Sequence, residues 1–281
     1  MPPASPQPDA AVLYVPDVGA EESVRAWSSD VAGVAEVLRA RFTSHAYPPH
    51  THDTWTLLLV DTGAVRFDLD RREHGALGDR VTLLPPGVPH DGRATTAAGF
   101  HKRVVYLDPD VLDPRRVGAA VDHPGWVDGT LRAEVSRLHE ALVDPAEAFE
   151  AEDRLASVAA RLDALLGAPQ PSRHVDHGTA SRLRELLDAR TGTGLTLVEA
   201  ARLVGVSPTH LVRSFSAAYG IAPHRYLTGR RIDRARRLLL AGTPPASVAV
   251  AVGFHDQPHL TRQFRRYLGV TPAAYARSAR S

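Results

Sequence analysis

The segment LTLVEAARLVGVSPTHLVRSFSAAYG (195–220) decides the fold of the C-terminal third. Thr196 and Glu199 have the spacing of a capping box, which predicts that a helix begins there. Gly205 is placed to end this helix, because glycine readily adopts the left-handed conformation that a helix end requires. Ser207 is then placed to cap a second helix. The segment therefore predicts two helices joined by a tight turn.

A second segment, PPASVAVAVGFHDQPHLTRQFRRYLG (244–269), repeats this plan. Gly253 is placed to end its first helix, and Asp256 is placed to cap its second helix. The apolar pair Leu260 and Phe264, four residues apart, would anchor the second helix to a core. Two helix–turn–helix units about one turn of DNA apart (about 34 Å) can enter successive major grooves of one duplex. The repeat therefore favours DNA binding over a helical bundle with solvated arginines.

The second helix of each unit is predicted to present a polar face to the bases. A guanidinium group matches the O6 and N7 acceptors of guanine, so Arg213 and Arg262 are the strongest candidates for base contacts. The full set of candidate DNA-contacting residues is Thr209, His210, Val212, Arg213, Gln257, His259, Thr261, Arg262 and Arg265. The helix between the two units is expected to expose arginines that contact phosphate. These arginines are Arg230, Arg231, Arg234 and Arg237.

Charge is divided unevenly along the chain. Residues 1–170 carry 16 basic and 26 acidic side chains, whereas residues 171–281 carry 17 basic and 6 acidic ones. The basic third is suited to a polyanion such as DNA, although a charged surface can also serve solubility alone. This division indicates two domains with different partners.

Length and composition restrict the classes of protein that fit. The 281 residues, of which 43% are hydrophobic and 23% charged, suit one large or two ordinary globular domains. The absence of cysteine excludes disulfides, thiolate metal sites and thiol nucleophiles. No apolar run is long enough to span a membrane, and the Pro-rich N-terminus lacks the features of a signal peptide. A cytoplasmic location is therefore expected.

The N-terminal part is predicted to be antiparallel β-structure. Val65, Phe67 and Leu69 alternate with polar residues, as in a strand with one buried face. The more continuous apolar run 55–61 predicts a strand covered on both faces, and residues 61–63 predict a short hairpin loop after it. The predicted strands are 37–42, 55–61, 64–70, 80–85 and 103–107.

Two helices are predicted between residues 130 and 166, separated at Asp144-Pro145. Each has an apolar stripe at helical spacing. The stripes would either cover the β-domain or pair with a second copy across a two-fold axis. The Pro- and Gly-rich stretch 167–178 is expected to link a domain of residues 1–166 to a helical domain of residues 179–281.

The basic third resembles the DNA-binding domain of AraC-type transcriptional regulators. The strongest resemblance lies in GFHDQPHLTRQFRRYLGVTPAAY (253–275), which is close to the C-terminal signature of that family. It implies a ligand-responsive regulator that binds double-stranded promoter DNA and senses a small-molecule effector. It also implies a homodimer through the 130–166 helices and contact with RNA polymerase. Further matching residues are Ser207, Leu211, Phe215, Gly220, Pro223, Tyr226, Ala235, Leu238 and Leu239.

Three histidines of the N-terminal part resemble the two cupin motifs. His50 and His52 follow the first motif on a strand, where residues two apart share a face, and His90 follows the second motif. The resemblance implies a cupin-like barrel in which three imidazoles hold one divalent transition metal, Zn, Ni, Mn or Fe. Thr56 stands where a metal cupin has glutamate, so the histidines would alternatively line an organic ligand pocket without metal.

The expected fold has two domains: an N-terminal all-β cupin-like barrel with flanking helices, and a C-terminal all-α domain with two helix–turn–helix units. Trp55 is expected as an apolar wall of the effector pocket and Arg103 as the partner of an anionic ligand. The expected function is sequence-specific regulation of transcription without catalysis. The alternatives are a metal-dependent cupin enzyme with an appended helical domain and a protein that coats DNA without sequence preference. The candidate effector-binding residues are His50, His52, Trp55, His90 and Arg103.

Overall fold

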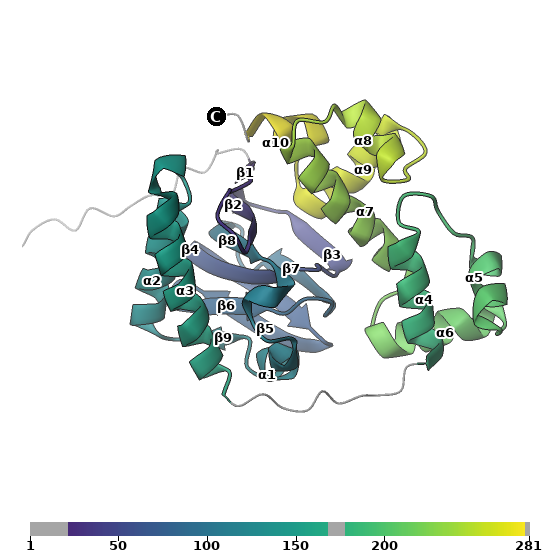
Figure 1. Cartoon of the computed structure of the whole chain (residues 1–281), viewed down its shortest axis with the longest axis horizontal. Coiled ribbons are helices and arrows are strands. Elements are labelled where there is room, and N and C mark those ends of the chain that lie inside the picture. Colours follow the sequence, from purple (N-terminus) through teal and green to yellow (C-terminus); the bar gives the residue numbers. More distant parts are fainter. Residues whose placement is uncertain (1–21, 168–177, 279–281) are drawn as a thin grey trace, which may run out of the picture.

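A computed structural model describes residues 22–167 and 178–278 of the chain. A sheet-rich N-terminal domain precedes a helical C-terminal domain, as the sequence predicts (Figure 1). The predicted linker 167–178 falls almost entirely between the two ranges and so lies outside the described residues. No helix within these ranges is both long and apolar enough to cross a lipid bilayer.

The sheet domain contains nine strands in the described ranges, and all of their pairings are antiparallel. They are β1 (Ser23–Trp27), β2 (Val34–Phe42), β3 (Ala46–His50), β4 (Trp55–Leu69), β5 (Arg72–Leu77), β6 (Val81–Leu84), β7 (His90–Ala94), β8 (Phe100–Leu107) and β9 (Gly125–Trp126). The main path runs β1-β2-β8-β4-β6-β9, and β4 also pairs with β5 and β7. The long strand β4 therefore joins both groups of strands.

The predicted hairpin loop at residues 61–63 is wrong, because these residues belong to β4. The chain continues through these residues as one strand, with a bulge between Val60 and Thr62 opposite β8. Gly63 has a φ of 75°, and a Cβ atom there would lie 2.1 Å from the carbonyl oxygen of Gly99. The glycine therefore serves a bulge and a close approach of two chain segments, where the sequence suggested a turn.

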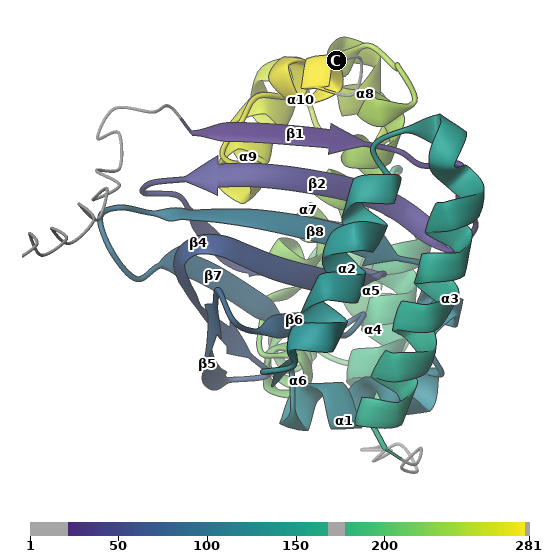
Figure 2. The same cartoon turned by 90° about the vertical axis from the view of Figure 1, so that its left-hand side faces the viewer.

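Side chains of β4 alternate between two apolar cores. Trp55, Leu57 and Leu59 enter a core shared with α2 (Gly129–Ala141) and α3 (Ala148–Leu165), which cover this side of the sheet (Figure 2). Leu58 and Val60 enter the opposite core, which includes side chains of the helical domain. This strand is covered on both faces as predicted. The apolar stripes of α2 and α3 are buried against the sheet, so they are not free to form the predicted dimer interface.

The helical domain forms both helix–turn–helix units where the sequence predicts them. The Thr196–Glu199 capping box is present, Gly205 is left-handed with a φ of 80°, and Asp256 accepts a hydrogen bond from the backbone N–H of His259. The helices are α4 (Gly178–Ala189), α5 (Leu197–Val204), α6 (Pro208–Tyr219), α7 (Pro223–Leu240), α8 (Pro245–Ala251), α9 (Gln257–Leu268) and α10 (Pro272–Ser278). The first unit is α5–α6 and the second is α8–α9.

Helix α7 runs between the two groups of helices and lies against the sheet domain, where it contacts β3 (Figure 1). The second unit shares its core with the sheet domain, because Leu260 and Phe264 belong to the same apolar cluster as Leu58 and Val60 of β4. Helices α9 and α10 also contact β3 and β1. The helical domain is thus docked on the sheet domain through α7 and the second unit.

Candidate functional site

The three predicted histidines come together at the interface between the domains. His50 ends β3, His52 follows it, and His90 begins β7, which pairs with β3. One ring nitrogen of each histidine lies within 4.8 Å of the others, and all three side chains are buried. The closest pair is Nε2 of His50 and Nε2 of His52, 3.2 Å apart. Strand pairing therefore brings the two cupin-like motifs to one point, as the sequence predicts.

The second nitrogen of each ring has a partner of its own. Nδ1 of His50 lies 2.7 Å from the carbonyl oxygen of Pro48, and Nδ1 of His90 lies 3.0 Å from that of Val88. A carbonyl oxygen only accepts, so both Nδ1 atoms carry the proton. Burial and the neighbouring histidines lower the pKa of His50 well below its usual range and that of His90 to about 3. Both rings are therefore neutral, with Nε2 as the free acceptor.

The partner of His52 comes from the other domain. Nδ1 of His52 lies 2.9 Å from Oδ1 of Asp233, which belongs to α7. Both side chains are at least nine-tenths buried. A carboxylate at this position fixes the ring with the proton on Nδ1 and its Nε2 toward the cluster. No local pattern predicts this contact, because 181 residues separate the two positions.

The histidines line a pocket that both domains enclose. Lys102 and Tyr106 of β8 contribute to its wall, and Leu268, the last residue of α9, closes it from the helical domain. The ammonium of Lys102 lies 4.2 Å from the ring centre of Tyr47. Burial, with a smaller contribution from the charge of Arg236, lowers the pKa of Lys102 to about 7. Within the described ranges no carboxylate pairs with this ammonium.

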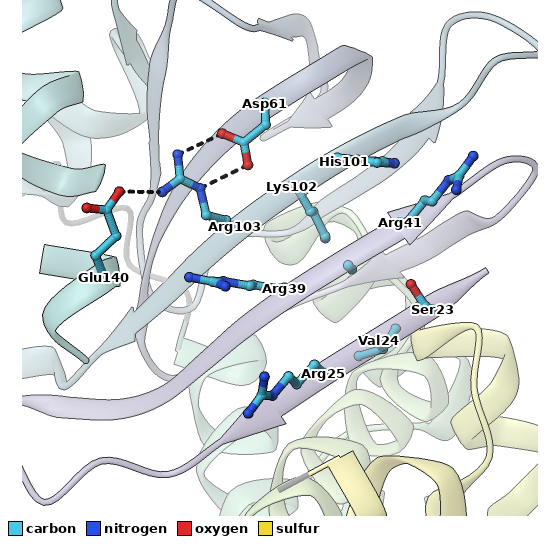
Figure 3. A pocket seen from close by; sticks show the side chains of 11 residues that line it. Ser23, Val24, Arg25, Arg39, Arg41, Asp61, His101, Lys102, Arg103 and Glu140 are labelled. Atoms are coloured by element: carbon cyan, nitrogen blue, oxygen red, sulfur yellow. Dashed lines mark hydrogen bonds and ion pairs between the residues drawn. The ribbon is translucent and has the colours of Figure 1, made fainter. Parts of the chain in front are cut away.

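Two of the predicted effector residues lie outside this pocket. Trp55 is fully buried in the core under α2 and α3, and its Nε1–H donates to the carbonyl of Pro109. Arg103 lies on the outer face of β8, where its guanidinium pairs with Asp61 at 2.7 Å (Figure 3). Alternation along β8 instead places Lys102 on the pocket side, one residue from the predicted position.

The outer face of β1, β2 and β8 forms a second, basic groove of about 650 Å³, and Lys102 belongs to its lining as well as to that of the histidine pocket (Figure 3). Arg25, Arg39 and His101 line it beside Arg103. Arg39 also donates toward Nδ1 of His139 on α2, at 3.4 Å. The sequence analysis did not single out this groove, since alternation alone does not show that arginines of three strands meet.

Charged pairs hold α7 to the sheet domain. Arg236 donates to Glu36 of β2 at 2.6 Å, and both side chains are at most 5% exposed. Burial acts to lower the pKa of Arg236, but the carboxylate of Glu36 holds it well above the ordinary value. Asp53 pairs with Arg230 at 3.2 Å and with Arg237 at 3.1 Å. The prediction that Arg230 points outward to phosphate is therefore wrong, because its side chain is only 18% exposed and also pairs with Asp188. Arg237 is exposed as predicted, although its guanidinium pairs with Asp53.

The two other arginines of α7 differ from each other. Nε of Arg231 donates to the carbonyl of Thr191 at 2.9 Å, so this side chain is used within the helical domain. Arg234 is exposed, as expected of a residue that contacts phosphate.

Both predicted DNA-reading faces remain accessible while the domains are docked. Arg213 of α6 and Arg262 of α9 are exposed. His259 is less open, because its ring packs edge-on against Phe254 with ring centres 5.1 Å apart. The exposed members of the predicted set are Thr209, His210, Arg213, Gln257, Arg262 and Arg265, and the half-buried ones are Val212, His259 and Thr261.

Comparisons with known proteins match both domains. The family model described as an AraC-like ligand binding domain matches residues 33–187, and a helix-turn-helix domain model matches residues 200–278. The uncharacterized HTH-type transcriptional regulator YbfI of Bacillus subtilis is 25% identical over 80% of this chain and 85% of its own length. The MmsAB operon regulatory protein of Pseudomonas aeruginosa is 30% identical over 85% of this chain and 80% of its own length.

A solved structure shows the same two-domain fold. The crystal structure of an apo ToxT variant from Vibrio cholerae superposes with a TM-score of 0.60, at 9% identity, over 92% of this chain and 96% of that one. Because the ligand-binding model alone spans more than half of the chain, and a 30% identical relative covers most of it, the family is settled. The chain is a sequence-specific DNA-binding transcriptional regulator with a ligand-binding domain, and it belongs to the AraC-type family.

Proposed function

We propose that the pocket lined by Lys102 and the three histidines is the effector site and that it takes a small anionic molecule. The proposal rests on the ammonium of the half-buried Lys102, which lies 4.2 Å from the ring centre of Tyr47 and has no carboxylate partner in the described ranges. A partly buried cation without a partner is costly, so an anion that reaches it gains a strong charge-assisted contact.

The same pocket offers a route from effector to DNA. Its wall includes Leu268, the last residue of α9, and α9 is the second helix of the second helix–turn–helix unit. An occupant of the pocket therefore touches the helix that carries Arg262. An effector shifts a conformational equilibrium only through contacts that differ between two states, and a contact on α9 supplies such a difference.

The size of the pocket supports this coupling. The cavity holds about 60 Å³, whereas sites for drug-sized ligands hold roughly 300–1,000 Å³. An effector of more than a few atoms must therefore displace part of the wall. Leu268 is the part that belongs to the other domain, so a larger occupant would move α9 relative to the sheet domain.

Thermal unfolding with short-chain carboxylates, and with their uncharged amides, tests the site. Carboxylates that fit should raise the melting temperature of the wild-type chain, and the amides should not. Lys102→Met should lose the response. Arg25→Gln, which changes the outer basic groove, should keep it. Loss of the response in Arg25→Gln alone would move the anion site to that groove and overturn the proposal.

Homodimerisation belongs to the same proposal, on a surface other than the buried stripes of α2 and α3. Phe149, at the start of α3, is 84% exposed. Phe149→Asp should lower the molar mass measured by light scattering from dimer to monomer, whereas Val198→Asp, at an exposed apolar residue of α5, should not. A monomeric wild-type chain would contradict this part. Contact with RNA polymerase, which the family implies, stays a prediction.

The proposal assigns no reaction to the chain. The two relatives compared above are named as regulators, which agrees with this. A metal-dependent cupin enzyme remains the competing function. Consumption of a pocket-binding carboxylate by the full chain, followed by NMR, would favour the enzyme.

A further inference from the structure

The three histidines are arranged to share one ligand. Nδ1 of each ring forms a hydrogen bond with an oxygen atom of Pro48, Val88 or Asp233. This leaves Nε2 of each ring as an acceptor. Nε2 of His50 and Nε2 of His52 lie only 3.2 Å apart. Two acceptors at this distance repel each other unless a proton or a metal ion lies between or beside them. The cluster is therefore built for a cation.

The donor set fits a divalent transition metal. Neutral imidazole suits zinc, copper, iron and nickel, and no thiol competes because the chain has no cysteine. Three protein ligands leave zinc an open position. The hydroxyl of Thr56, on the same pocket wall, is buried without a hydrogen-bond partner among the described residues. An unsatisfied buried oxygen beside the cluster fits a site that holds a further polar group.

Asp233 makes the site depend on both domains. Metal-binding histidines in proteins usually donate their second N–H to a carboxylate or carbonyl, which orients the ring and raises its basicity. Here the carboxylate belongs to α7, whereas all three histidines belong to the sheet domain. The other oxygen of Asp233, Oδ2, is buried without a hydrogen bond within the described ranges. Oδ2 lies 3.8 Å from Nη1 of Arg230, so the carboxylate serves His52, Arg236 and Arg230.

We propose that His50, His52 and His90 bind one divalent metal ion such as Zn²⁺, and that Asp233 of α7 positions His52 for it, so that metal binding and domain docking reinforce each other. Coupling between two equilibria is reciprocal. If docking of α7 strengthens the metal site, the bound metal must strengthen docking by the same factor. This inference goes beyond the effector proposal and does not depend on what the effector is.

The first experiment measures the metal directly. Wild-type chain, stripped of metal with a chelator, is titrated with Zn²⁺ against a chromophoric competitor. One equivalent should bind, and His90→Gln should lose most of this binding while keeping its circular dichroism spectrum. Failure of the folded wild-type chain to bind Zn²⁺, Ni²⁺ or Fe²⁺ would overturn the site, whatever the carboxylate response of Lys102 shows.

The second experiment tests the positioning role. Asp233→Asn should bind Zn²⁺ about 10–100-fold more weakly, the usual loss for such a partner. The matched control is Glu185→Gln, which removes a carboxylate from the exposed surface of α4 in the same domain and should bind like the wild type. Equal affinity of Asp233→Asn and Glu185→Gln would overturn the role of Asp233.

The third measurement reads domain docking rather than metal affinity. Zn²⁺ should slow hydrogen exchange of backbone amides in α7 of the wild-type chain, and it should do so much less in Asp233→Asn. A purely local site would protect β3 and β7 and leave α7 unchanged. Such a result would overturn the link between the metal and the docking of the domains.

Discussion

The two helix–turn–helix units have the same local design but different tertiary surroundings. The first unit has its own apolar core, in which Leu211 and Phe215 pack with residues of α4 and α5. The second unit shares its core with the sheet domain, and Leu260 and Phe264 belong to a cluster that reaches β4. The position of the second unit therefore depends on the contents of the sheet domain, while that of the first depends mainly on the helical domain itself.

Because of this difference, a ligand in the pocket can displace the second unit while the first unit keeps its position. A change in the pocket acts directly on Leu268 and hence on α9. The first unit is tied to the sheet domain by a hydrogen bond from Arg71 to the carbonyl of Ala217. We therefore expect an effector to control DNA binding by changing the position of the second unit relative to the first.

The largest effect is expected at the buried pair that ties α7 to β2. Arg236→Met leaves the carboxylate of Glu36 buried without its cation, which should cost about 3–5 kcal/mol of stability. Fluorescence-monitored urea unfolding reports on the sheet domain, because Trp27, Trp55 and Trp126 all lie in it. The double variant with Glu36→Leu should recover part of the loss.

Hydrogen exchange of the Arg236→Met variant separates the two units. Amides of α8 and α9 should exchange faster, and those of α5 and α6 should stay protected. Equal loss of protection in both units would show that the first unit depends on the sheet domain as much as the second.

Substitution of the two arginines that are predicted to contact bases should have the next largest effect. Arg213→Ala and Arg262→Ala should each cost about 1–3 kcal/mol of DNA affinity and relax sequence preference at one base position. Arg234→Ala, at the exposed arginine of α7, should instead weaken all sequences alike and lower the salt slope by about one unit. Binding to a randomised DNA library measures all three, and identical profiles would remove the distinction between base and phosphate contacts.

Acid should weaken the sheet domain through His139, which lies on the buried face of α2 and is 1% exposed. Burial and the charge of Arg39 lower its pKa to about 4, so the unfolded chain takes up the proton first as the pH falls below about 6.5. Stability should fall by up to about 1.4 kcal/mol per pH unit between these two values. His139→Gln should flatten this part of the urea-unfolding profile, and an unchanged profile would exclude the histidine as its source.

The smallest effect is expected at the contact of the first unit. Arg71→Ala removes the hydrogen bond to Ala217 at an exposed position and should change stability by less than about 0.5 kcal/mol. A larger loss in urea unfolding would show that the first unit is docked as firmly as the second.

Local chemistry made much of the helical domain predictable. The capping box at Thr196, the left-handed Gly205 and the cap at Asp256 each act within a few residues, so their spacing in the sequence is enough. The convergence of the three histidines could also be predicted, because the cupin-like motifs carry the pairing of two strands. The ion pairs of Arg230 and Arg237 on α7 could not be predicted, since their partner Asp53 lies about 180 residues away in the sequence.

Errors in the sheet domain have a common physical origin. Alternation shows that neighbouring strand residues face opposite sides but does not show which side is the pocket. Arg103 was expected inside and Lys102 lies there instead. Trp55 was likewise assigned to the pocket, although β4 directs it to the core under α2 and α3. The bulge of β4 between Val60 and Thr62 adds a residue that alternation does not predict.

Lys102 is the single lysine among 281 residues, and every other long basic side chain is arginine. Reagents that modify amines therefore have two targets in this chain, the N-terminal amine and the pocket itself. With a pKa of about 7, a large share of Lys102 is the reactive free amine at neutral pH. Reductive methylation with ¹³C-formaldehyde would place one isotope-labelled probe inside the cavity, and its NMR signal would report occupancy in this chain without any substitution.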